Sequence, residues 1–300
     1  MVSCCVWQFF HQVHRPRTIL NGQLRTRRLG ILDRPLLMGI VNVTPDSFSD
    51  GGQFFQLEQA VEHALGLFKQ GADLLDIGGE STRPYSDSVS LQEELDRVVP
   101  VVEQIRARED AIISIDTSKA EVARECLVRG VEIINDVTGF CGDEEMVPLA
   151  VESQAGVCVM HMQGTPQNMQ DAPEYKNVVE DVFDFLSTRR DYLMEAGVSQ
   201  NRICLDPGLG FGKTLNHNLE LLQQIAIFHR LGCPLLVGHS RKGFIKKILE
   251  TELEPDAVID REAGTLGVSF SLASRGVQIL RVHNIELMRQ ALILFGAAGH

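Results

Sequence analysis

The amino-acid sequence predicts an α/β protein that folds as a single (β/α)8 barrel, also called a TIM barrel. From Leu36 onward the chain repeats one unit, in which an apolar run is followed by a polar loop and then by an amphipathic helix. Eight such units occur without tandem hairpins, which favours a parallel sheet with helical crossovers. About 265 residues follow residue 35, and the barrel typically needs ~250.

An open, doubly wound sheet is the alternative fold. Such a sheet usually has a glycine fingerprint directly after its first strand. Here the pair Gly51-Gly52 comes about ten residues after the first apolar run. The barrel is therefore the better prediction, with a catalytic domain over residues 31–300.

The expected strands are short apolar runs that end in polar residues or glycine. A continuous apolar run is typical of a strand covered on both faces, as in a parallel barrel. In chain order the runs are 36–41, 74–77, 112–115, 132–134, 157–160, 203–205, 234–237 and 278–283.

Apolar residues at helical spacing predict the helices between these strands. They recur over 57–68, where Gly71 ends the helix, and again over 91–105. Longer helices are expected at about 175–196 and 285–295.

The helix after the third strand shows a start and a stop signal. We expect Thr117 or Ser118 to cap its first turn, and Gly130 to close it.

Composition limits the class of protein. A hydrophobic content of 44% in 300 residues supplies ample core, and no run approaches the ~18 apolar residues of a membrane span. The net charge of −12 argues against a nucleic-acid partner but does not exclude an anionic substrate, because local cations outweigh a screened distant field. The seven cysteines include no Cys-x-x-Cys pair, so we expect reduced thiols in a cytoplasmic protein.

Residues 1–30 differ from the rest of the chain. They are apolar up to Phe10, carry five arginines between Arg15 and Arg28, and have no acidic residue. A secretory signal is not indicated, because the order of charges is wrong and no small-residue cleavage site follows. We interpret the segment as a poorly ordered extension or the result of an upstream start codon, with a loose likeness to an organellar transit peptide.

The segment 38–52 combines a strand with a loop rich in polar groups. Asn42 ends the strand, and Phe48 and Asp50 lie among polar residues of the loop. Any one residue here fits a helix cap or an ordinary connection between strand and helix. The density of polar chemistry favours a binding loop.

Polar residues follow the other expected strands in the same way. In a barrel the carboxyl ends of all strands meet at one mouth, where active sites are built. Taken alone, each of these residues could have an ordinary structural role as a helix cap, a turn residue or a buried core histidine. All of them would have to take such roles on the same face of the barrel, so we favour a common site. The set comprises Asn42, Thr82, Arg83, Asp116, Asn135, Asp206, Lys242, Arg281 and His283.

The chemistry of this set predicts two adjacent subsites. Cationic donors from Arg83, Lys242, Arg281 and His283, with the N-terminus of a helix starting at Ser240, suit an anion. Asn42 offers a hard oxygen for Mg²⁺ that is otherwise held by water and phosphates. The acceptors Asp116, Asn135 and Asp206 suit a donor-rich planar heterocycle, for which Met160 and Phe211 give apolar faces.

The sequence resembles the dihydropteroate synthase family over nearly all of 36–295. Long blocks carry the resemblance: MGIVNVTPDSFSDGG, GGESTRP, SIDTSK, IINDV, CVMHMQG, LDPGLGFGK, VGHSRK and RVH. It implies a barrel enzyme of folate synthesis that joins 4-aminobenzoate to 6-hydroxymethyl-7,8-dihydropterin diphosphate. It also implies Mg²⁺ as cofactor and a homodimer formed through barrel helices.

The resemblance also implies roles for the matching residues. Asn42 would bind Mg²⁺, while Asp116, Asn135, Asp206 and Lys242 would hold the pterin. Arg281 and His283 would bind diphosphate, and Thr82 and Arg83 would lie in the substrate loop. Phe48 and Asp50 would belong to a loop that closes over both substrates, and Ser240 would lie near the aminobenzoate carboxylate. We expect Asp116, Lys242, Arg281 and His283 to contribute most to catalysis.

Four residues depart from the family pattern: His239 precedes Ser240, Tyr85 and Ser86 follow Pro84, and Asn284 follows His283. They bear on selectivity among aminobenzoate analogues. Two other functions are alternatives. One is a pterin-binding barrel that transfers a methyl group from methyltetrahydrofolate to a corrinoid protein. The other is a paralogue that binds pterin without turnover.

Overall fold

Eight parallel strands form one sheet in the order β6-β5-β4-β3-β2-β1-β8-β7 in the computed structural model, which describes residues 34–44 and 53–299. An isolated parallel bridge between Leu205 and Leu235 brings the two ends of this order together. The predicted (β/α)8 barrel is therefore confirmed. The strands are β1 (Leu36–Asn42), β2 (Leu74–Gly78), β3 (Ile112–Asp116), β4 (Ile133–Asp136), β5 (Gly156–Met160), β6 (Ile203–Asp206), β7 (Leu236–Gly238) and β8 (Ile279–Val282).

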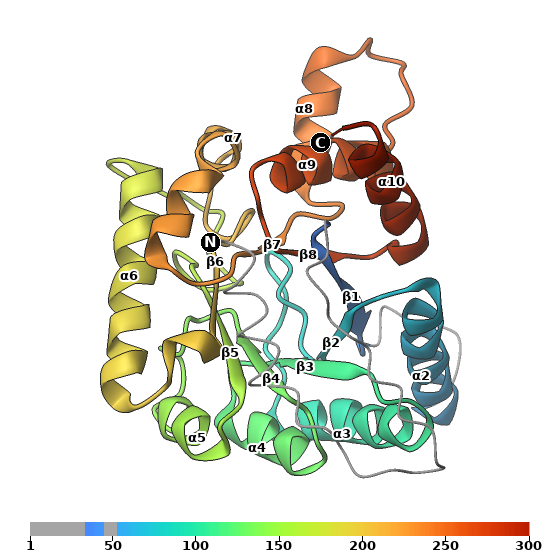
Figure 1. Cartoon of the computed structure of the whole chain (residues 1–300), viewed down its shortest axis with the longest axis vertical. Helices are drawn as coiled ribbons and strands as arrows, with labels where there is room; N and C mark the ends of the chain where they lie inside the picture. The colour runs from blue at the N-terminus through green and yellow to red at the C-terminus, as the bar shows by residue number, and fades with distance from the viewer. Residues whose placement is uncertain (1–33, 45–52, 300) are drawn as a thin grey trace.

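Helices surround the strands on the outside (Figure 1). Two of them, α8 and α9, occupy the connection between β7 and β8. Short 3-10 helices, η2 (Gln200–Arg202) and η3 (Ile225–Leu231), flank β6 and α7. The α-helices are α2 (Gln53–Gln70), α3 (Leu91–Arg108), α4 (Ala120–Val128), α5 (Met146–Ser153), α6 (Val178–Ala196), α7 (Leu215–Gln223), α8 (Gly243–Glu252), α9 (Arg261–Ser274) and α10 (Ile285–Ala297).

The alternation of side chains along each strand divides the core into two parts. Outward side chains, such as Leu37, Leu75 and Ile113, are fully buried against the helices. Inward side chains fill the barrel interior with a separate cluster, so the barrel is a packed core and not a channel. That inner cluster consists of Leu36, Met38, Leu74, Ile112, Ile133, Cys158, Cys204, Leu236 and Ile279.

The inward rows become polar toward the carboxyl ends of the strands. On β2, for example, Leu74 is followed two positions later by Asp76, and on β8 Ile279 is followed by Arg281. Asp76 and Ser114 pair in register between β2 and β3, so they lie in the same layer. The apolar inner cluster therefore forms a floor under a polar mouth.

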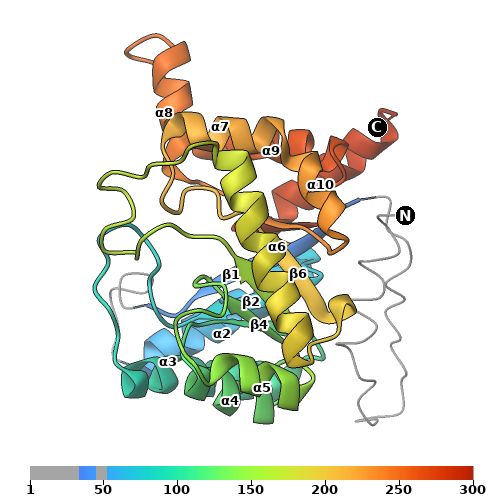
Figure 2. The ribbon, with the colours of Figure 1, turned by 90° about the vertical axis from the view of Figure 1, so that its left-hand side faces the viewer.

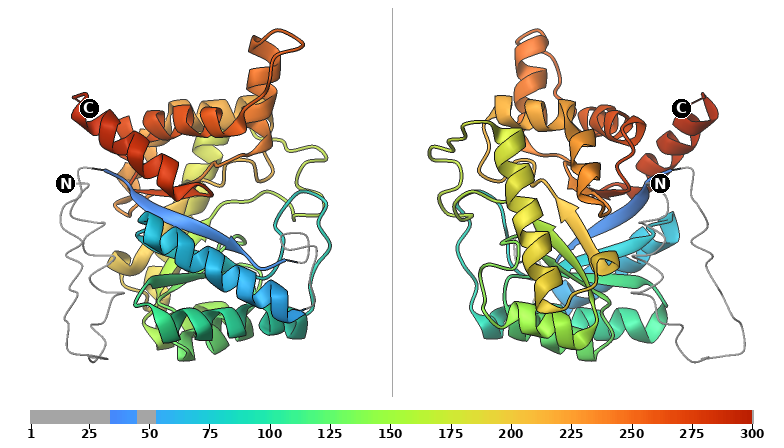
Figure 3. Two further views of the ribbon diagram at one scale, coloured as in Figure 1. Left: turned by 90° about the vertical axis from the view of Figure 1, so that its right-hand side faces the viewer. Right: turned by 60° about the vertical axis from the view of Figure 1, so that its left-hand side comes forward.

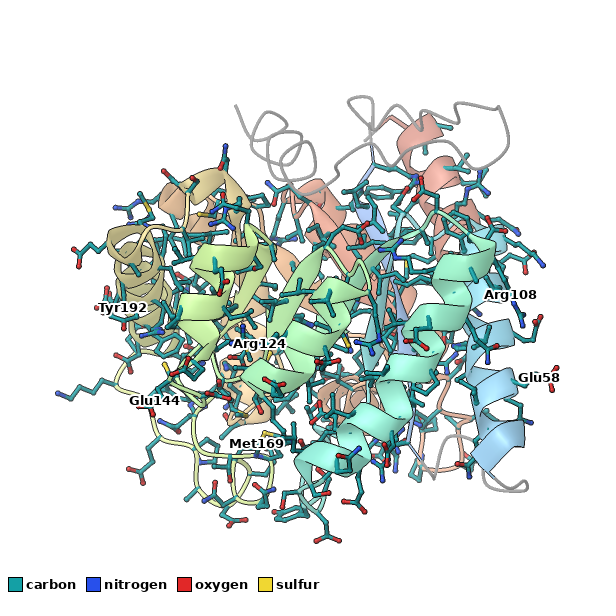
Figure 4. All side chains as sticks on the ribbon, turned by 90° about the horizontal axis from the view of Figure 1, so that it is seen from below. Glu58, Arg108, Arg124, Glu144, Met169 and Tyr192 are labelled. Atoms are coloured by element: carbon teal, nitrogen blue, oxygen red, sulfur yellow. The ribbon has the colours of Figure 1, made fainter. Side chains whose placement is uncertain are left out.

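The connections that follow the strands gather at this mouth. Figure 4 places Glu144 and Met169, from the connections after β4 and β5, toward one end of the molecule, and Arg108, at the end of α3, toward the other. In Figures 2 and 3 the connection between β2 and α3 lies beside the connection between β5 and α6.

The predicted cap of α4 is wrong. Lys119 occupies the N-cap position, and no side chain at that position caps the helix. The first free backbone N–H, that of Ala120, donates instead to Asp143 at 2.8 Å, while Thr117 accepts from the N–H of Lys119 at 3.2 Å. Asp143, which is distant in the sequence, therefore accepts the bond from the first turn of α4 that a local hydroxyl was expected to accept. Gly130 follows the helix with a positive φ of 92°, as predicted for its end.

Residues 1–33 and 45–52 lie outside the described residues, and with them the predicted extension at 1–30 and the predicted loop residues Phe48 and Asp50. No helix within 34–44 and 53–299 is long and apolar enough to cross a membrane.

Candidate active site

A network of charged groups links β2, β3, β4 and β8 at the barrel mouth. Arg281 donates from Nε to Asp76 Oδ2 at 2.6 Å and from a terminal nitrogen to Asp116 Oδ2 at 2.8 Å. The amide nitrogen of Asn135 donates to the same Asp76 oxygen at 3.1 Å. Three residues predicted for the site, Arg281, Asp116 and Asn135, are thus brought together.

Asp76 belongs to this network, but the sequence prediction did not include it. Its side chain is fully buried, and within the described residues its second oxygen, Oδ1, has no hydrogen-bond partner. A buried carboxylate needs a cation or several donors, and Arg281 and Asn135 are its partners here. The signal that could have identified Asp76 from the sequence is a charged residue inside an otherwise apolar strand.

Burial and neighbouring charges set the protonation of this network. Burial raises the pKa of Asp116 to about 7, against the opposing charge of Arg281 and with the support of the charge of Asp76. Burial alone would lower the pKa of Arg281, but the charges of Asp76 and Asp116 outweigh it and raise that pKa. Asp116 therefore gains or loses its proton near neutral pH, while Arg281 stays charged.

Asp206 and the glycine-rich segment after β6 form the next wall of the mouth. Asp206 accepts from the N–H of Gly208 at 2.7 Å. Gly208 has a φ of 67°, and a Cβ at this position would lie 1.9 Å from the carbonyl oxygen of His161. Only glycine fits this close approach between two loops. Asp206-Pro-Gly therefore forms a turn at the end of β6, while the role of Asp206 as a site residue stays a prediction.

Lys242 and Phe211 are in contact in this part of the mouth. The ammonium nitrogen of Lys242 lies 4.1 Å from the centre of the Phe211 ring and donates to the carbonyl of Leu209. Burial lowers the pKa of Lys242 to about 7, and the charge of Asp206 opposes that shift. Burial raises the pKa of Asp206, and Lys242 opposes it in turn. Lys242 and Asp206 thus depend on each other for their charge.

Ser240 and His283 form a second contact between neighbouring strand ends. The Ser240 hydroxyl lies 2.9 Å from His283 Nδ1 and accepts from the backbone N–H of His283 at 3.3 Å. Burial, followed by the charge of Arg241, lowers the pKa of His283 to about 3. His283 is therefore neutral, in contrast to the cationic donor expected from the sequence.

The predicted helix start at Ser240 is also wrong. Helix α8 begins at Gly243, and Lys242 holds the N-cap position without a side-chain cap. Arg241 between them has a φ of 58°, and its backbone N–H donates to Thr265 at 3.1 Å. The tertiary bond to Thr265 holds this turn, so the helix starts three residues later than the local sequence indicates.

The remaining predicted residues lie around the same mouth. Met160 ends β5, is buried, and pairs in register with Asp206. Asn42 ends β1, is partly buried, and pairs in register with Gly78. Thr82 and Arg83 lie in the connection after β2, where Arg83 is exposed.

A buried pair next to the site also escaped the sequence prediction. The Lys213 amine lies 2.9 Å from His161 Nδ1 and donates to the carbonyl of Phe211 at 2.9 Å. Burial lowers the pKa of Lys213 well below its usual value, and burial lowers that of His161 to about 2. His161 is therefore neutral, burial disfavours the charged form of Lys213, and the contacts of both side chains hold the loop that carries Phe211.

The fold and this mouth define the class: a (β/α)8 barrel with a polar site at the carboxyl ends of its strands. The profile of the family described as "Pterin binding enzyme" matches residues 38–283. The chain belongs to this family of pterin-binding enzymes.

Named relatives narrow the comparison. A dihydropteroate synthase from Haemophilus influenzae is 44% identical over 269 residues, which is 90% of this chain and 96% of the relative. The structure of the Xanthomonas albilineans dihydropteroate synthase with 4-aminobenzoic acid superposes with a TM-score of 0.81 at 42% identity, covering 89% of this chain and 93% of that one. The same enzyme in complex with 7,8-dihydropteroate gives a TM-score of 0.78 at 39% identity, covering 89% and 94%.

Proposed function

We propose that this chain joins 4-aminobenzoate to 6-hydroxymethyl-7,8-dihydropterin diphosphate and releases 7,8-dihydropteroate and diphosphate, a step of folate biosynthesis. The relatives named above support the reaction. The observation that carries it is the position of three acceptors, Asp116, Asn135 and Asp206, beside the cations Lys242 and Arg281 in one mouth. Acceptors suit the donor-rich edge of a pterin, and cations suit the diphosphate.

The acceptors fix the ring of the pterin in this proposal. Asp116, Asn135 and Asp206 come from β3, β4 and β6, so they approach a flat ring from different sides. Phe211 and Met160 supply apolar surface for the faces of the ring. Lys242 donates to the ring as well, and its contacts with the Leu209 carbonyl and the Phe211 ring keep it oriented.

The reaction requires charge separation at the methylene group of the pterin. Diphosphate leaves with negative charge while positive charge develops on the electron-rich ring, so we infer a dissociative substitution. Arg281 stabilises the departing charge, His283 donates to it as a neutral group, and ionised Asp116 offsets the charge on the ring. Each well-placed group of this kind contributes about 3–4 kcal/mol, and positioning the weak arylamine nucleophile contributes up to ~7–11 kcal/mol.

We also propose Mg²⁺ as the cofactor, held by Asn42. The carboxamide oxygen of Asn42 is a hard donor at the tip of β1, on the rim beside β8, which carries Arg281. Within the described residues no group of three His, Cys, Asp or Glu side chains gathers around a possible ion. A single amide therefore fits an ion whose other ligands are water and phosphate oxygens. When bound, Mg²⁺ would neutralise charge on the leaving diphosphate.

Thr82, Arg83 and Ser240 surround the place of the second substrate in this proposal. Arg83 is exposed in the connection after β2, and its charge is one of the causes that lower the pKa of His283. Its guanidinium is therefore within electrostatic reach of the His283 side of the mouth. A carboxylate on 4-aminobenzoate would meet Arg83 and the Ser240 hydroxyl.

We further propose a cytoplasmic homodimer. Helix α10 exposes Leu294, Ile293 and Leu287 to 70%, 53% and 38%, and Phe295 of this helix stacks on Phe270 of α9. Apolar side chains grouped on one helix suit a second copy of the chain. The described cysteines, four of them buried, are free thiols, as expected in a reducing compartment. Sedimentation of the wild-type chain and of Leu294→Glu tests the dimer, which the glutamate should dissociate.

An assay of pteroate and diphosphate formed from the two substrates tests the function. The wild-type chain should form both products, and the double variant Asn42→Ala with Arg281→Ala should release no diphosphate. Arg108→Ala, which removes an exposed arginine at the far end of α3, is the matched control and should keep full activity (Figure 4). Near-normal turnover of the double variant contradicts the proposal.

Two other outcomes select the alternative functions. Methyl transfer from methyltetrahydrofolate without diphosphate release identifies a corrinoid methyltransferase. Tight pterin binding without any turnover identifies a non-catalytic paralogue.

A further inference from the structure

Tyr85 adopts a backbone conformation that is unfavourable for its side chain. Its φ is 64°, in the left-handed region that bulky residues rarely enter. The side chain is 64% exposed, so burial of the ring does not compensate for this conformation. A strained, exposed aromatic residue needs specific bonds to stay in place, and functional sites are where such residues concentrate.

Two hydrogen bonds join Tyr85 to the connection between β5 and α6. Its backbone N–H donates to the carbonyl oxygen of Pro166 at 2.9 Å, and its hydroxyl donates to Asp171 Oδ1 at 3.1 Å. The carboxylate of Asp171 also raises the pKa of Tyr85 through this bond, so the hydroxyl stays protonated and able to donate. Figures 2 and 3 show the two connections side by side, although they are far apart in sequence.

On its near side, Tyr85 closes a short turn that carries Thr82 and Arg83. The hydroxyl of Ser86 donates to the carbonyl oxygens of Ser81 at 2.5 Å and of Arg83 at 2.8 Å. The backbone N–H of Ser86 also donates to the Arg83 carbonyl at 3.1 Å. The turn is therefore internally fixed, and Tyr85 determines where it lies relative to the rest of the mouth.

On its far side, the connection after β5 is bonded to the loop that carries Phe211, which lines the proposed binding place of the pterin (the pterin pocket). Gln170, next to Asp171, donates to the carbonyl of Gly210 at 2.8 Å, and Tyr175 donates to the carbonyl of Gly212 at 2.7 Å. Both glycines flank Phe211, which faces Lys242. A continuous chain of bonds thus runs from Arg83 through Tyr85 to the Phe211 loop.

We propose that Tyr85 is a positioning residue that sets the separation between the Thr82–Arg83 turn and the pterin pocket, and so determines how well the aminobenzoate carboxylate is bound. The proposal rests on the proposed function, because that function assigns the turn to the second substrate. Tyr85 itself does not touch the reacting atoms. Without its hydroxyl bond, the turn keeps its internal shape and the backbone bond to Pro166, but it is held less firmly relative to the Phe211 loop.

Steady-state kinetics of Tyr85→Phe test this role, because the variant keeps the ring and the backbone strain and removes only the hydroxyl. The KM for 4-aminobenzoate should rise about 3- to 10-fold, the loss expected for one partly exposed hydrogen bond. The kcat and the KM for pterin diphosphate should stay within about 2-fold of wild type, because the pterin contacts are untouched. Tyr192→Phe, on an exposed tyrosine near the end of α6, is the matched control and should change nothing.

Asp171 provides the second half of the test. Asp171→Ala should raise the KM for 4-aminobenzoate as much as Tyr85→Phe does. The double variant should have no higher KM than either single variant, because all three variants remove the same hydrogen bond. Asp171→Asn keeps an acceptor oxygen and should restore most of the affinity. Additive effects of the two single changes, or an unchanged KM in both, overturn the proposal.

Hydrogen exchange separates this proposal from the reaction itself. In the substrate-free chain, Tyr85→Phe should speed amide exchange in segments 81–90 and 165–171 and leave α6 unchanged. If the wild-type chain forms no pteroate but this exchange result holds, the proposed function fails while the link between the loops stands. Unchanged exchange in both segments overturns the positioning role even if the enzyme is active.

Discussion

Asp76 Oδ2 accepts a hydrogen bond from Arg281 Nε at 2.6 Å across a sequence separation of 205 residues. β2 and β8 both pair with β1, so this bond crosses one strand of the barrel at the level of the mouth. The same oxygen accepts from Asn135 on β4. One buried carboxylate therefore orients a guanidinium and an amide that come from separate strands.

Asp76→Ala should weaken both the fold and the site. Removing one partner of a buried ion pair costs about 3–5 kcal/mol, and the bond from Arg281 to Asp116 keeps the loss near the lower figure. Because Arg281 and Asn135 lose their orientation, kcat/KM for pterin diphosphate should fall roughly 10- to 100-fold. Urea unfolding and steady-state kinetics measure the two effects. Asp76→Asn, which still offers an acceptor oxygen, should lose less stability and less activity. An Asp76→Ala variant with the stability and kcat/KM of the wild-type protein would contradict this role.

The pH dependence of kcat/KM for pterin diphosphate should be bell-shaped with its maximum near pH 7. This constant reports ionisations of the free enzyme. Asp116, with its pKa raised to about 7, must lose its proton to offset the charge on the ring, so activity falls on the acidic side. Lys242, with its pKa lowered to about 7, must keep its proton, so activity falls on the basic side. A flat profile between pH 6 and 8 contradicts this account, and Asp116→Asn should lose the acidic limb.

Lys242→Met should stabilise the substrate-free protein, and more at pH 6 than at pH 9. The folded pKa of Lys242 lies below its unfolded value, so charging the buried amine destabilises the native state below pH 7, and this penalty fades as the pH rises toward 10.5. Each pKa unit corresponds to ~1.4 kcal/mol and the penalty falls over the two pH units between 7 and 9, so the gain at pH 6 should exceed that at pH 9 by about 3 kcal/mol. Thermal unfolding at the two pH values measures the difference. An equal gain at both would show that Lys242 does not titrate in this range.

Gly208→Ala should disrupt the loop that follows β6. A methyl group at this position would meet the His161 carbonyl oxygen at 1.9 Å, and the φ of 67° is unfavourable for alanine. The loss of stability should exceed about 3 kcal/mol, or the loop should move and pterin binding should be lost. Gly66→Ala, in the interior of α2 with open space around it, is the control and should gain up to about 1 kcal/mol. Calorimetry and a pterin-binding titration distinguish the two results.

The fold follows from the sequence because its signal is periodic. Each apolar run ends in a polar residue, and a helical pattern follows, so the order of strands and the end of the barrel that carries the site are both readable from sequence. Local sequence signals for the start of a helix are less reliable. Thr117 and Ser240 both resemble helix starts, but bonds to Asp143 and Thr265, far along the chain, decide where α4 and α8 begin.

The same limit applies to the site. Residues at strand tips, such as Asp116 and Asn135, were predictable because the barrel sends every tip to one mouth. Asp76 lies two residues before the end of β2, where the sequence offers only a charge inside an apolar run. The lowered pKa values of His283 and Lys213 depend on burial and on cations that include Arg241 and Lys242, and no local pattern contains this information.

The bridge between Leu205 and Leu235 has a consequence for how firmly the barrel is closed. The other neighbouring strands share ladders of several residues, whereas β6 and β7 meet at this isolated pairing. Asp206 ends β6 and Lys242 follows β7, so the two stand on either side of the seam. A heterocycle that binds both side chains would add contacts across this seam, so β6 and β7 should separate less often in the complex than in the free protein.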